Sequence, residues 1–194
     1  MNLNKCPWFE DGGLLERYHD EEWGQPCHDD RLLYEYLMLE CLSAGLSWKL
    51  MLQKRSVFRE CLAGFDFERL ASFDETDIAA ALAFPGMIRS RRKIEAIVGN
   101  ARCYRQIRSE WGSFDRYIWS FTEGRTVIYQ THLDGGWKTV STLSETIAGD
   151  LRRRGFKYLG PTLVYSYLQS VGVVNDHEPD CYLFGQVGGD VVPE

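Results

Sequence analysis

The sequence predicts a mainly α-helical fold, organised as a single domain over residues 1–194. Apolar residues return at three- and four-residue spacing through most of the chain, which is typical of amphipathic helices. The strand-like stretch runs from Thr126 to Gln130, and the His132-Leu-Asp-Gly-Gly that follows it predicts a loop. There is no internal repeat or Pro/Ser-rich linker, and a chain of this length buries a sizeable core without disulfides. Residues 183–194 are a candidate disordered tail.

The segment from Asp29 to Leu62 predicts helix with one interruption. The periodic positions are Leu32, Leu33, Tyr36, Leu37 and Glu40. An Asp pair at the start of the segment suits N-capping, and Gly45 is expected to divide it into two helices.

Residues 76–107 predict two helices joined by a tight hairpin. Thr76 is expected to cap a short Ala-rich helix that ends at Phe84, and Pro85-Gly86 predicts a turn. A long basic helix follows from Ser90 to Ile107. Its inward positions are Ile94, Ile97, Val98 and Ala101. The predicted order is therefore a helix, a tight hairpin and a second helix.

Two further helices are expected toward the C-terminus. Thr142 and Glu145 fit a capping box that opens a helix ending at Gly155. Pro161 suits the first turn of a second helix, which runs to about Val171.

Charge and composition exclude several classes of protein. Lys and Arg number 22 against 28 Asp and Glu, and the net charge of −6 opposes nucleic acid unless basic residues gather on one face. No run approaches the ~18 apolar residues of a membrane helix, and Met1 to Glu10 lacks the apolar core of a signal peptide. We therefore expect a cytoplasmic, monomeric protein that does not bind membranes. The six cysteines form no CxxC pair, which argues against a disulfide framework and a zinc ribbon.

Cysteine and histidine residues near the two ends of the chain make one candidate metal site. Cys6 and His19 lie near the N-terminus, and His177 and Cys181 near the C-terminus. Two thiolates and two imidazoles are the ligand set of a closed, structural zinc site. Two alternatives stay open: the four side chains are satisfied within the core, or Cys27-His28 supplies ligands instead. The sequence contains no H-E-x-x-H motif, so a zinc hydrolase has little support.

Basic residues gather around the predicted hairpin. The cluster comprises Arg89, Arg91, Arg92, Lys93, Arg102 and Arg105, with a second group at Arg152, Arg153, Arg154 and Lys157. A hairpin that leads into a helix N-terminus offers backbone N–H groups to an anion, and flanking cations add phosphate contacts. The pattern fits non-specific binding of a DNA backbone. The alternative is a solvated helix face, which a run of charges alone favours and which the Pro85-Gly86 turn counters only in part.

A third group combines aromatic residues with one carboxylate. Glu40 lies in an apolar run, and helical spacing from Leu37 turns it toward the core, where an unpartnered carboxylate is costly. Together with Tyr18, Trp23 and Trp48 it suits a flat, cationic ligand. The alternatives are core packing for the rings and a buried ion pair with an arginine for Glu40.

These residues together resemble one family, the 3-methyladenine DNA glycosylase I branch of the helix-hairpin-helix glycosylases. The matching segments are Cys6-Pro-Trp8, Tyr18-His-Asp-Glu-Glu-Trp-Gly24, Leu39-Glu40, Ala44-Gly-Leu-Ser-Trp48, Gly86-Met-Ile-Arg-Ser-Arg-Arg-Lys-Ile94, Gly99-Asn-Ala-Arg102, Arg154-Gly-Phe-Lys157 and Val174-Asn-Asp-His-Glu-Pro-Asp-Cys181. The resemblance implies that the terminal Cys/His set binds structural Zn²⁺. It implies a base pocket lined by Tyr18, Glu40 and Trp48, with Trp8 and Trp23 beside it. It also implies that the hairpin around Gly86 binds DNA phosphate.

The implied activity is excision of 3-methyladenine from alkylated double-stranded DNA, with Glu40 as the catalytic carboxylate. An alkylated adenine is a good leaving group, so water can attack the sugar with little acid catalysis once the nucleotide is flipped out. No lysine stands out as a Schiff-base nucleophile, so no lyase activity is expected. The chain departs from the family at Cys41-Leu-Ser43 and at Phe84-Pro85. Alternatives are a zinc-stabilised DNA-binding protein without catalysis and a glycosylase for a different alkylated base.

Overall fold

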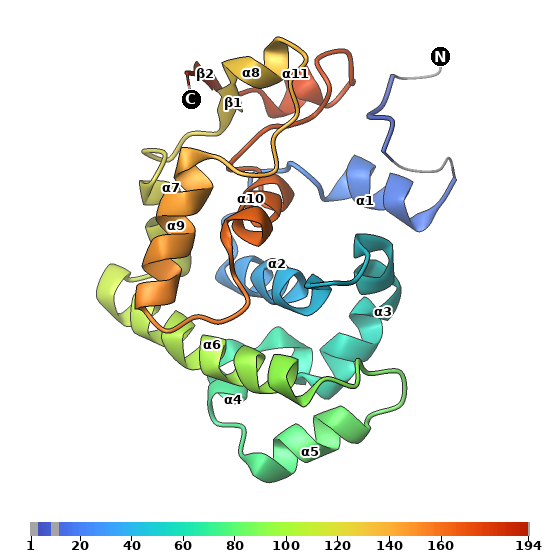
Figure 1. The fold of residues 1–194 in the computed structure, drawn as a ribbon, viewed down its shortest axis with the longest axis vertical. Helices are drawn as coiled ribbons and strands as arrows, with labels where there is room; N and C mark the ends of the chain where they lie inside the picture. Colours follow the sequence, from blue (N-terminus) through green and yellow to red (C-terminus); the bar gives the residue numbers. More distant parts are fainter. Residues whose placement is uncertain (1–3, 9–11, 194) are drawn as a thin grey trace.

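Helices packed around a shared apolar core make up most of the structure, a computed structural model that describes residues 4–8 and 12–193 (Figure 1). The helices are α1 (Leu14–Glu21), α2 (Asp30–Ser43), α3 (Trp48–Cys61), α4 (Phe67–Ala71), α5 (Glu75–Ala83), α6 (Arg91–Trp111), α7 (Phe114–Ser120), α8 (Gln130–Leu133), α9 (Thr142–Arg153), α10 (Pro161–Ser170) and α11 (Phe184–Val187), with a 3₁₀ turn, η1 (Ala63–Phe65). The strands are β1 (Val127–Tyr129) and β2 (Asp190–Val192). The prediction of a mainly helical fold is confirmed.

Helix α2 is the central element, and residues 33–43 are buried all around it. Its neighbours are α3, α6, α7 and α10, so the apolar run is explained by contact on every side. The helix begins as predicted at the Asp pair, where Asp29 accepts hydrogen bonds from the N–H groups of Arg31 and Leu32. It ends before Gly45, whose φ of +77° is the left-handed conformation that glycine adopts readily. The predicted break between α2 and α3 is confirmed.

Helices α5 and α6 and the turn at residues 84–90 follow the predicted order. The N-cap of α5 is Asp74, in a capping box with Asp77, so the prediction of Thr76 as the cap is wrong by two positions. Gly86 has a φ of +84° in the turn. Helix α6 continues past the predicted end at Ile107 to Trp111, where Gly112 ends it.

The C-terminal helices also match, with one error in capping. Ser141 and Ser144, rather than Thr142 and Glu145, form the capping box of α9, because the Ser144 hydroxyl bonds back to the N-cap N–H. Helix α9 is followed by the predicted Gly155 at a φ of +98°, and α10 begins at Pro161.

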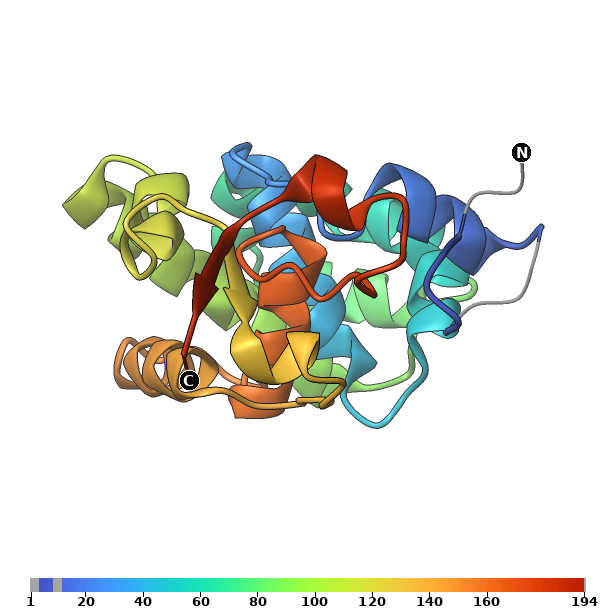
Figure 2. The same ribbon diagram turned by 90° about the horizontal axis from the view of Figure 1, so that it is seen from above.

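The prediction of a disordered tail is wrong for residues 183–193. They form α11 and then β2, which pairs in parallel with β1 so that Ile128 aligns with Val191 (Figure 2). The β1 strand, predicted over 126–130, is buried, and the tail completes its hydrogen bonding where Asp190 N–H donates to the Thr126 carbonyl at 2.9 Å. His132 lies in the helical turn α8 rather than in the expected loop. Within the described residues, no helix is both long enough and apolar enough to cross a membrane.

Candidate functional site

Segments near the two ends of the chain meet at a buried cluster of cysteines and histidines. Cys6 and His19 come from the N-terminal segment and α1, and His177 and Cys181 from the segment after α10. One ligand atom from each lies within 4.8 Å of all the others. The sequence prediction that these four residues lie together is thereby borne out by their geometry, while Cys27 and His28 lie outside the cluster.

The spacing within the cluster fits a tetrahedral metal site. Sγ of Cys181 lies 3.5 Å from Nε2 of His19 and 3.8 Å from Nδ1 of His177, and Sγ of Cys6 lies 3.6 Å from the same Nδ1. Ordinary Zn–S and Zn–N bond lengths at tetrahedral angles place sulfur and nitrogen about 3.6 Å apart. These three sulfur–nitrogen distances therefore match those of a tetrahedral zinc site.

Hydrogen bonds outside the cluster fix the tautomer of each imidazole. Nδ1 of His19 contacts Asp20 at 2.8 Å, and Nε2 of His177 contacts the Trp23 carbonyl at 3.2 Å. Donation at those atoms leaves the opposite nitrogen of each ring free to bind a metal. Gly24 is required here, because a Cβ at this position would lie 2.6 Å from Nε2 of His177. The arrangement supports metal ligands rather than histidines satisfied within the core.

An aromatic wall connects this cluster to a pocket. The Trp23 ring packs edge-on against His177 with centroids 4.6 Å apart, and Trp8 packs against Trp23 at 5.1 Å. The ring centroids of Tyr18 and Trp48 lie 5.6 Å apart on the inner side of the pocket. A metal in the cluster would therefore hold the aromatic wall in place by tying α1 to the C-terminal segment.

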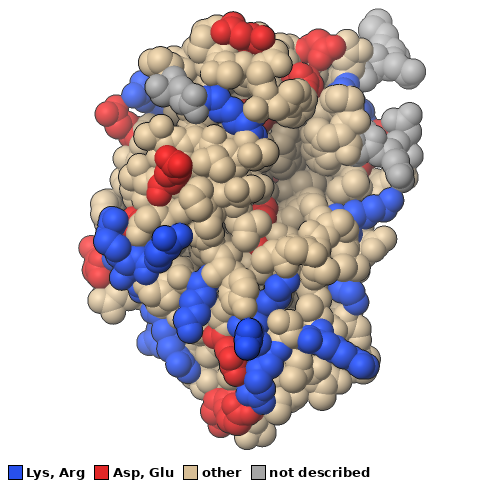
Figure 3. Space-filling model, in the orientation of Figure 1, with Lys and Arg blue, Asp and Glu red and all other residues tan. Residues whose placement is uncertain are grey.

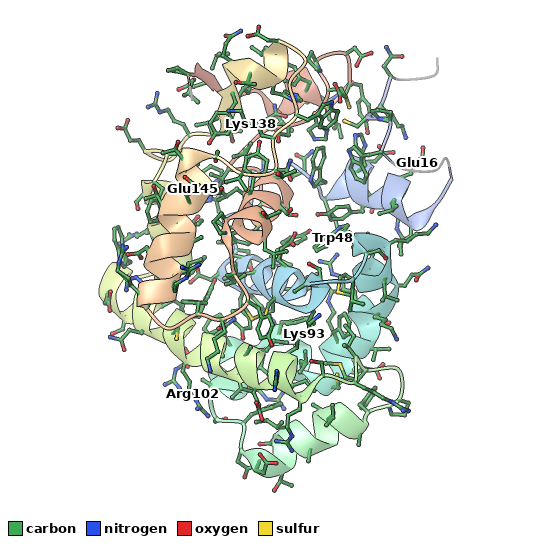
Figure 4. The ribbon with its side chains drawn as sticks, viewed as in Figure 1. Glu16, Trp48, Lys93, Arg102, Lys138 and Glu145 are labelled. Carbon is green, nitrogen blue, oxygen red and sulfur yellow. The ribbon has the colours of Figure 1, made fainter. Side chains whose placement is uncertain are left out.

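The pocket has a volume of about 460 Å³, within the range of small-molecule sites. Residues that line it are Trp8, Tyr18, Trp23, Glu40, Ser43, Gly45, Leu46, Trp48, Trp137, Leu163, Ser166, Gln169, Ser170 and Asp176. All five residues that the sequence assigns to a base pocket are among them. Trp48 is labelled in Figure 4, beside the start of α3.

Glu40 is a buried carboxylate in the pocket wall, with only 3% of its surface exposed. Its Oε2 accepts a hydrogen bond from the Ser43 hydroxyl at 3.2 Å, and none of the described lysines or arginines forms an ion pair with it. The buried ion pair considered from the sequence is therefore not present. Burial raises the pKa of Glu40 to about 8, and the bond from Ser43 lowers it only in part.

Two further groups in the pocket match a polar, flat ligand. The indole Nε1 of Trp48 is buried and has no hydrogen-bond partner among the described residues, which is uncommon for a buried donor. The Tyr18 hydroxyl donates to Oγ of Ser170 at 2.9 Å, which fixes the ring against the pocket. The pocket thus presents a donor, an acceptor and aromatic faces.

Sequence reasoning missed several pocket residues, Asp176 above all. Tyr165 and Gln169 donate to Oδ2 of Asp176 at 2.6 and 2.7 Å, while its Oδ1 is buried without a described partner. Its position beside His177 in the matching segment was the available signal. Ser170 and Trp137 had no such signal, because only the packing of α10 and of residues 134–141 brings them to the pocket.

The basic cluster near the hairpin divides into engaged and free side chains. Arg89 and Arg92 are exposed and form no ion pair with a described residue. Arg91 is exposed but pairs with Glu75 at 2.6 Å and with Glu95 at 3.2 Å. In Figure 3, Lys and Arg gather over the lower part of the face, below a hollow. The surface offered to an anion around Gly86 is therefore smaller than the sequence indicates.

The prediction that Lys93 contacts DNA phosphate is wrong. It is 8% exposed, and its Nζ donates at 2.7 Å to the carbonyls of Leu42 and Ala44 at the end of α2 (Figure 4). Burial lowers the pKa of Lys93, but the contact with helix-end carbonyls suits a cation. Lys93 is a structural residue of the helix packing.

We expect Lys93→Met to lower the free energy of unfolding by about 1.5–3 kcal/mol, because hydrogen bonds from a charged donor to buried carbonyls are lost. Urea unfolding measures this loss. The matched variant Arg92→Met, exposed on the same helix, should change stability by less than about 0.5 kcal/mol. An equal loss in both variants would contradict the assignment.

Comparison with known proteins identifies the fold and then the family. A crystal structure of a 3-methyladenine DNA glycosylase I has a TM-score of 0.86 and 40% identity, covering 92% of this chain and 98% of that one. Another, of a variant of such an enzyme in complex with 3-methyladenine, has a TM-score of 0.86 and 34% identity, covering 93% and 97%. The fold is therefore that of a DNA glycosylase.

The sequence comparisons identify the family. The chain is 37% identical over 179 residues to DNA-3-methyladenine glycosylase 1 of Escherichia coli (strain K12), covering 92% of this chain and 96% of that protein. The family model described as methyladenine glycosylase matches residues 8–184. The protein belongs to the methyladenine glycosylase family.

Proposed function

We propose that the protein is a monofunctional DNA glycosylase that flips 3-methyladenine out of alkylated double-stranded DNA and hydrolyses its N-glycosidic bond. The observation that carries this proposal is the pocket, which places a buried carboxylate without a counter-ion among aromatic rings in a member of this family. A solved relative with the same fold is in complex with 3-methyladenine. Release of that base from methylated duplex DNA by the purified protein tests the proposal.

The pocket suits a cationic purine better than a neutral one. Alkylation at N3 gives the base a positive charge, and aromatic faces attract flat cations. Glu40 accepts from the polar edge of the base, and the unpartnered N–H of Trp48 donates to an acceptor on it. An undamaged adenine is neutral, so it offers no charge to offset the cost of ionising the buried Glu40, whose pKa is raised by burial.

The chemistry needs little from the protein beyond binding and orientation. The charged base leaves readily, so selective stabilisation of the flipped, polarised nucleotide lowers the barrier and water completes hydrolysis at the sugar. No lysine is among the described residues that line the pocket, and Nζ of Lys93 is held by backbone carbonyls. The proposal therefore has no Schiff-base step and no strand cleavage.

The ion proposed for the Cys/His cluster is Zn²⁺, because two thiolates and two imidazoles at tetrahedral spacing are its ordinary ligands. All four positions are filled by protein, so the ion would stabilise the fold and activate no water. Burial, with a smaller contribution from the neighbouring Cys181, raises the pKa of Cys6 to about 12, and a bound cation would reverse this preference for the neutral thiol.

The α5–α6 hairpin is proposed to bind DNA phosphate as a helix-hairpin-helix motif. No side chain caps the N-terminus of α6, which leaves first-turn N–H groups for an anion beside Arg89 and Arg92. Contacts of this kind hold the duplex without reading its sequence. A cytoplasmic monomer remains part of the proposal.

Replacing Arg89 and Arg92 together by alanine should weaken binding to all duplexes alike. Loss of two phosphate contacts should reduce the slope of log K against log salt by roughly 1 to 2. Fluorescence anisotropy at several salt concentrations measures the slope. Arg125→Ala, an exposed arginine beside β1, serves as the control and should leave the slope unchanged. A loss restricted to one DNA sequence would contradict phosphate binding.

A different alkylated base is a second candidate substrate. Ser43 lies in the segment that departs from the family, and it both lines the pocket and bonds to Glu40. Comparing the release of 3-methyladenine and 3-methylguanine from the same DNA distinguishes the two substrates.

A further inference from the structure

The rim of the base pocket carries an exposed indole that the proposed function has not used. Trp137 is 68% exposed, more than any other large apolar side chain among the described residues. Leu46 and Trp8, at 40% and 36%, line the same pocket. An exposed apolar rim around a binding site usually marks a surface that a partner covers.

The segment that presents Trp137 is held firmly on both sides. Gly135 has a φ of +79°, and a Cβ at Gly136 would lie 2.7 Å from the Thr131 side chain, so the turn is tight. Before the turn, His132 bonds to the His177 carbonyl at 2.8 Å, and its ring contacts the Trp137 indole edge-on.

After the turn the chain faces inward again. Nζ of Lys138, labelled in Figure 4, lies 5.2 Å from the centre of the Tyr129 ring, and Ser141 caps α9. The turn therefore holds an indole outward between two anchored neighbours. Such an arrangement presents the ring in place before any partner binds.

We propose that Trp137 is a DNA-contact residue, which stacks on the bases that flank the flipped nucleotide at the mouth of the pocket. The proposal rests on the proposed function. Removing one nucleotide from the stack leaves neighbouring base faces uncovered, and an aromatic side chain can cover them whatever the sequence. Leu46, from the α2–α3 connection, and Trp137, from the α8–α9 connection, line the same pocket, so a nucleotide that enters it passes both.

Duplex DNA is the occupant that this rim fits. A protein partner seated on Trp137 would cover the mouth of the pocket that the substrate must enter. DNA covers the indole at the same time as it fills the pocket. The Trp137 ring is uncharged, so its contribution to the free energy of DNA binding should add to that of Arg89 and Arg92. It should not change how DNA binding depends on salt.

The test compares Trp137→Ala with Trp137→Phe and with Trp111→Ala, a tryptophan 40% exposed at the end of α6 and outside the pocket. Binding to a duplex that contains an abasic site should weaken about tenfold in Trp137→Ala, the usual size of one lost stacking contact. Trp137→Phe should recover most of this loss, and Trp111→Ala should match the parent. The salt slope and the affinity for free 3-methyladenine should stay at parental values in all three.

Parental duplex binding by Trp137→Ala would overturn the proposal. An equal loss of free-base affinity would also overturn it, because Trp137 would then bind the excised base rather than the bases that flank it in the duplex. The comparison on abasic DNA does not require catalysis. A parent protein that binds this duplex but releases no 3-methyladenine would contradict the proposed function while the role of Trp137 is still decided.

Discussion

Glu40→Gln should fold like the parent and excise 3-methyladenine roughly four- to tenfold more slowly. A charged acceptor contributes roughly 1.5–3 kcal/mol to a hydrogen bond, against about half of that for a neutral amide. Ser43 can donate to the amide oxygen as it does to the carboxylate, and no described arginine loses a partner. Thermal melts and single-turnover excision on the same preparation measure both outcomes.

The raised pKa of Glu40 also predicts how stability depends on pH. The folded protein keeps the Glu40 proton up to about pH 8, whereas an unfolded chain loses it near the ordinary value of 4.5. Between these values the folded state holds the extra proton, so this residue's contribution to stability falls as pH rises, by up to roughly 1.4 kcal/mol per unit. Glu40→Gln should remove that decline.

The raised pKa of Glu40 also predicts how binding depends on pH. A cationic nucleotide is bound by the ionised carboxylate, so the affinity of the parent for that nucleotide should rise toward pH 8 and then level.

Glu35→Gln is the matched control, because Glu35 is equally buried on the same helix. Its carboxylate pairs with Arg55 and, at 2.8 Å, with Arg59. Glu35→Gln removes its ion pairs with both arginines and leaves the largely buried Arg55 with Glu22 alone. Breaking a buried pair commonly costs about 3–5 kcal/mol, and the remaining pair with Glu22 should reduce that loss. Glu35→Gln should therefore lose stability but keep its activity per folded molecule. The same behaviour in Glu40→Gln would show that Glu40 is a structural carboxylate.

Cys181→Ala should release the metal and lower the melting temperature more than it lowers the intrinsic rate of excision. Structural zinc sites in small peptides contribute about 10–16 kcal/mol of apparent binding energy, which is available only to the folded state. Here the ion would join α1 to the segment after α10. Metal analysis of the purified protein should give one zinc per chain.

The control for Cys181→Ala is Cys27→Ala, at the alternative ligand pair. Cys27 lies outside the four-residue cluster, so this variant should retain its zinc. A parent protein that is fully folded and free of metal would contradict the zinc assignment, as would release of zinc by Cys27→Ala.

Helical periodicity predicted Glu40 correctly and, applied consistently, would have predicted Lys93 as well. Glu40 lies on the apolar pattern of α2, and the structure places it in the pocket wall. The charges beside Lys93 predict a solvent-facing side chain, yet Lys93 is four residues before Ile97, so the same face of α6 turns both inward. A run of basic residues on a helix includes every face, and only some of them meet solvent.

Other features depend on contacts between distant segments, which local patterns do not contain. The tail at 183–193 has little periodicity, and its strand forms because β1 leaves hydrogen-bonding groups for β2. Asp176 reaches the pocket because Tyr165 and Gln169 of α10 hold it there. The observed N-caps of α5 and α9 differ from the predicted ones by two positions and by one. Several Ser, Thr and Asp residues near each helix start can serve as the cap, and the local pattern does not choose between them.

Chromatographic identification of the bases released from methylated duplex DNA tests the central claim most directly. The purified, metal-loaded parent should release 3-methyladenine in preference to other methylated bases, without cutting the strand. Glu40→Gln, folded and loaded equally, should release it roughly four- to tenfold more slowly. Release of no methylated base by the folded parent, or of another base in preference to 3-methyladenine, would contradict the account.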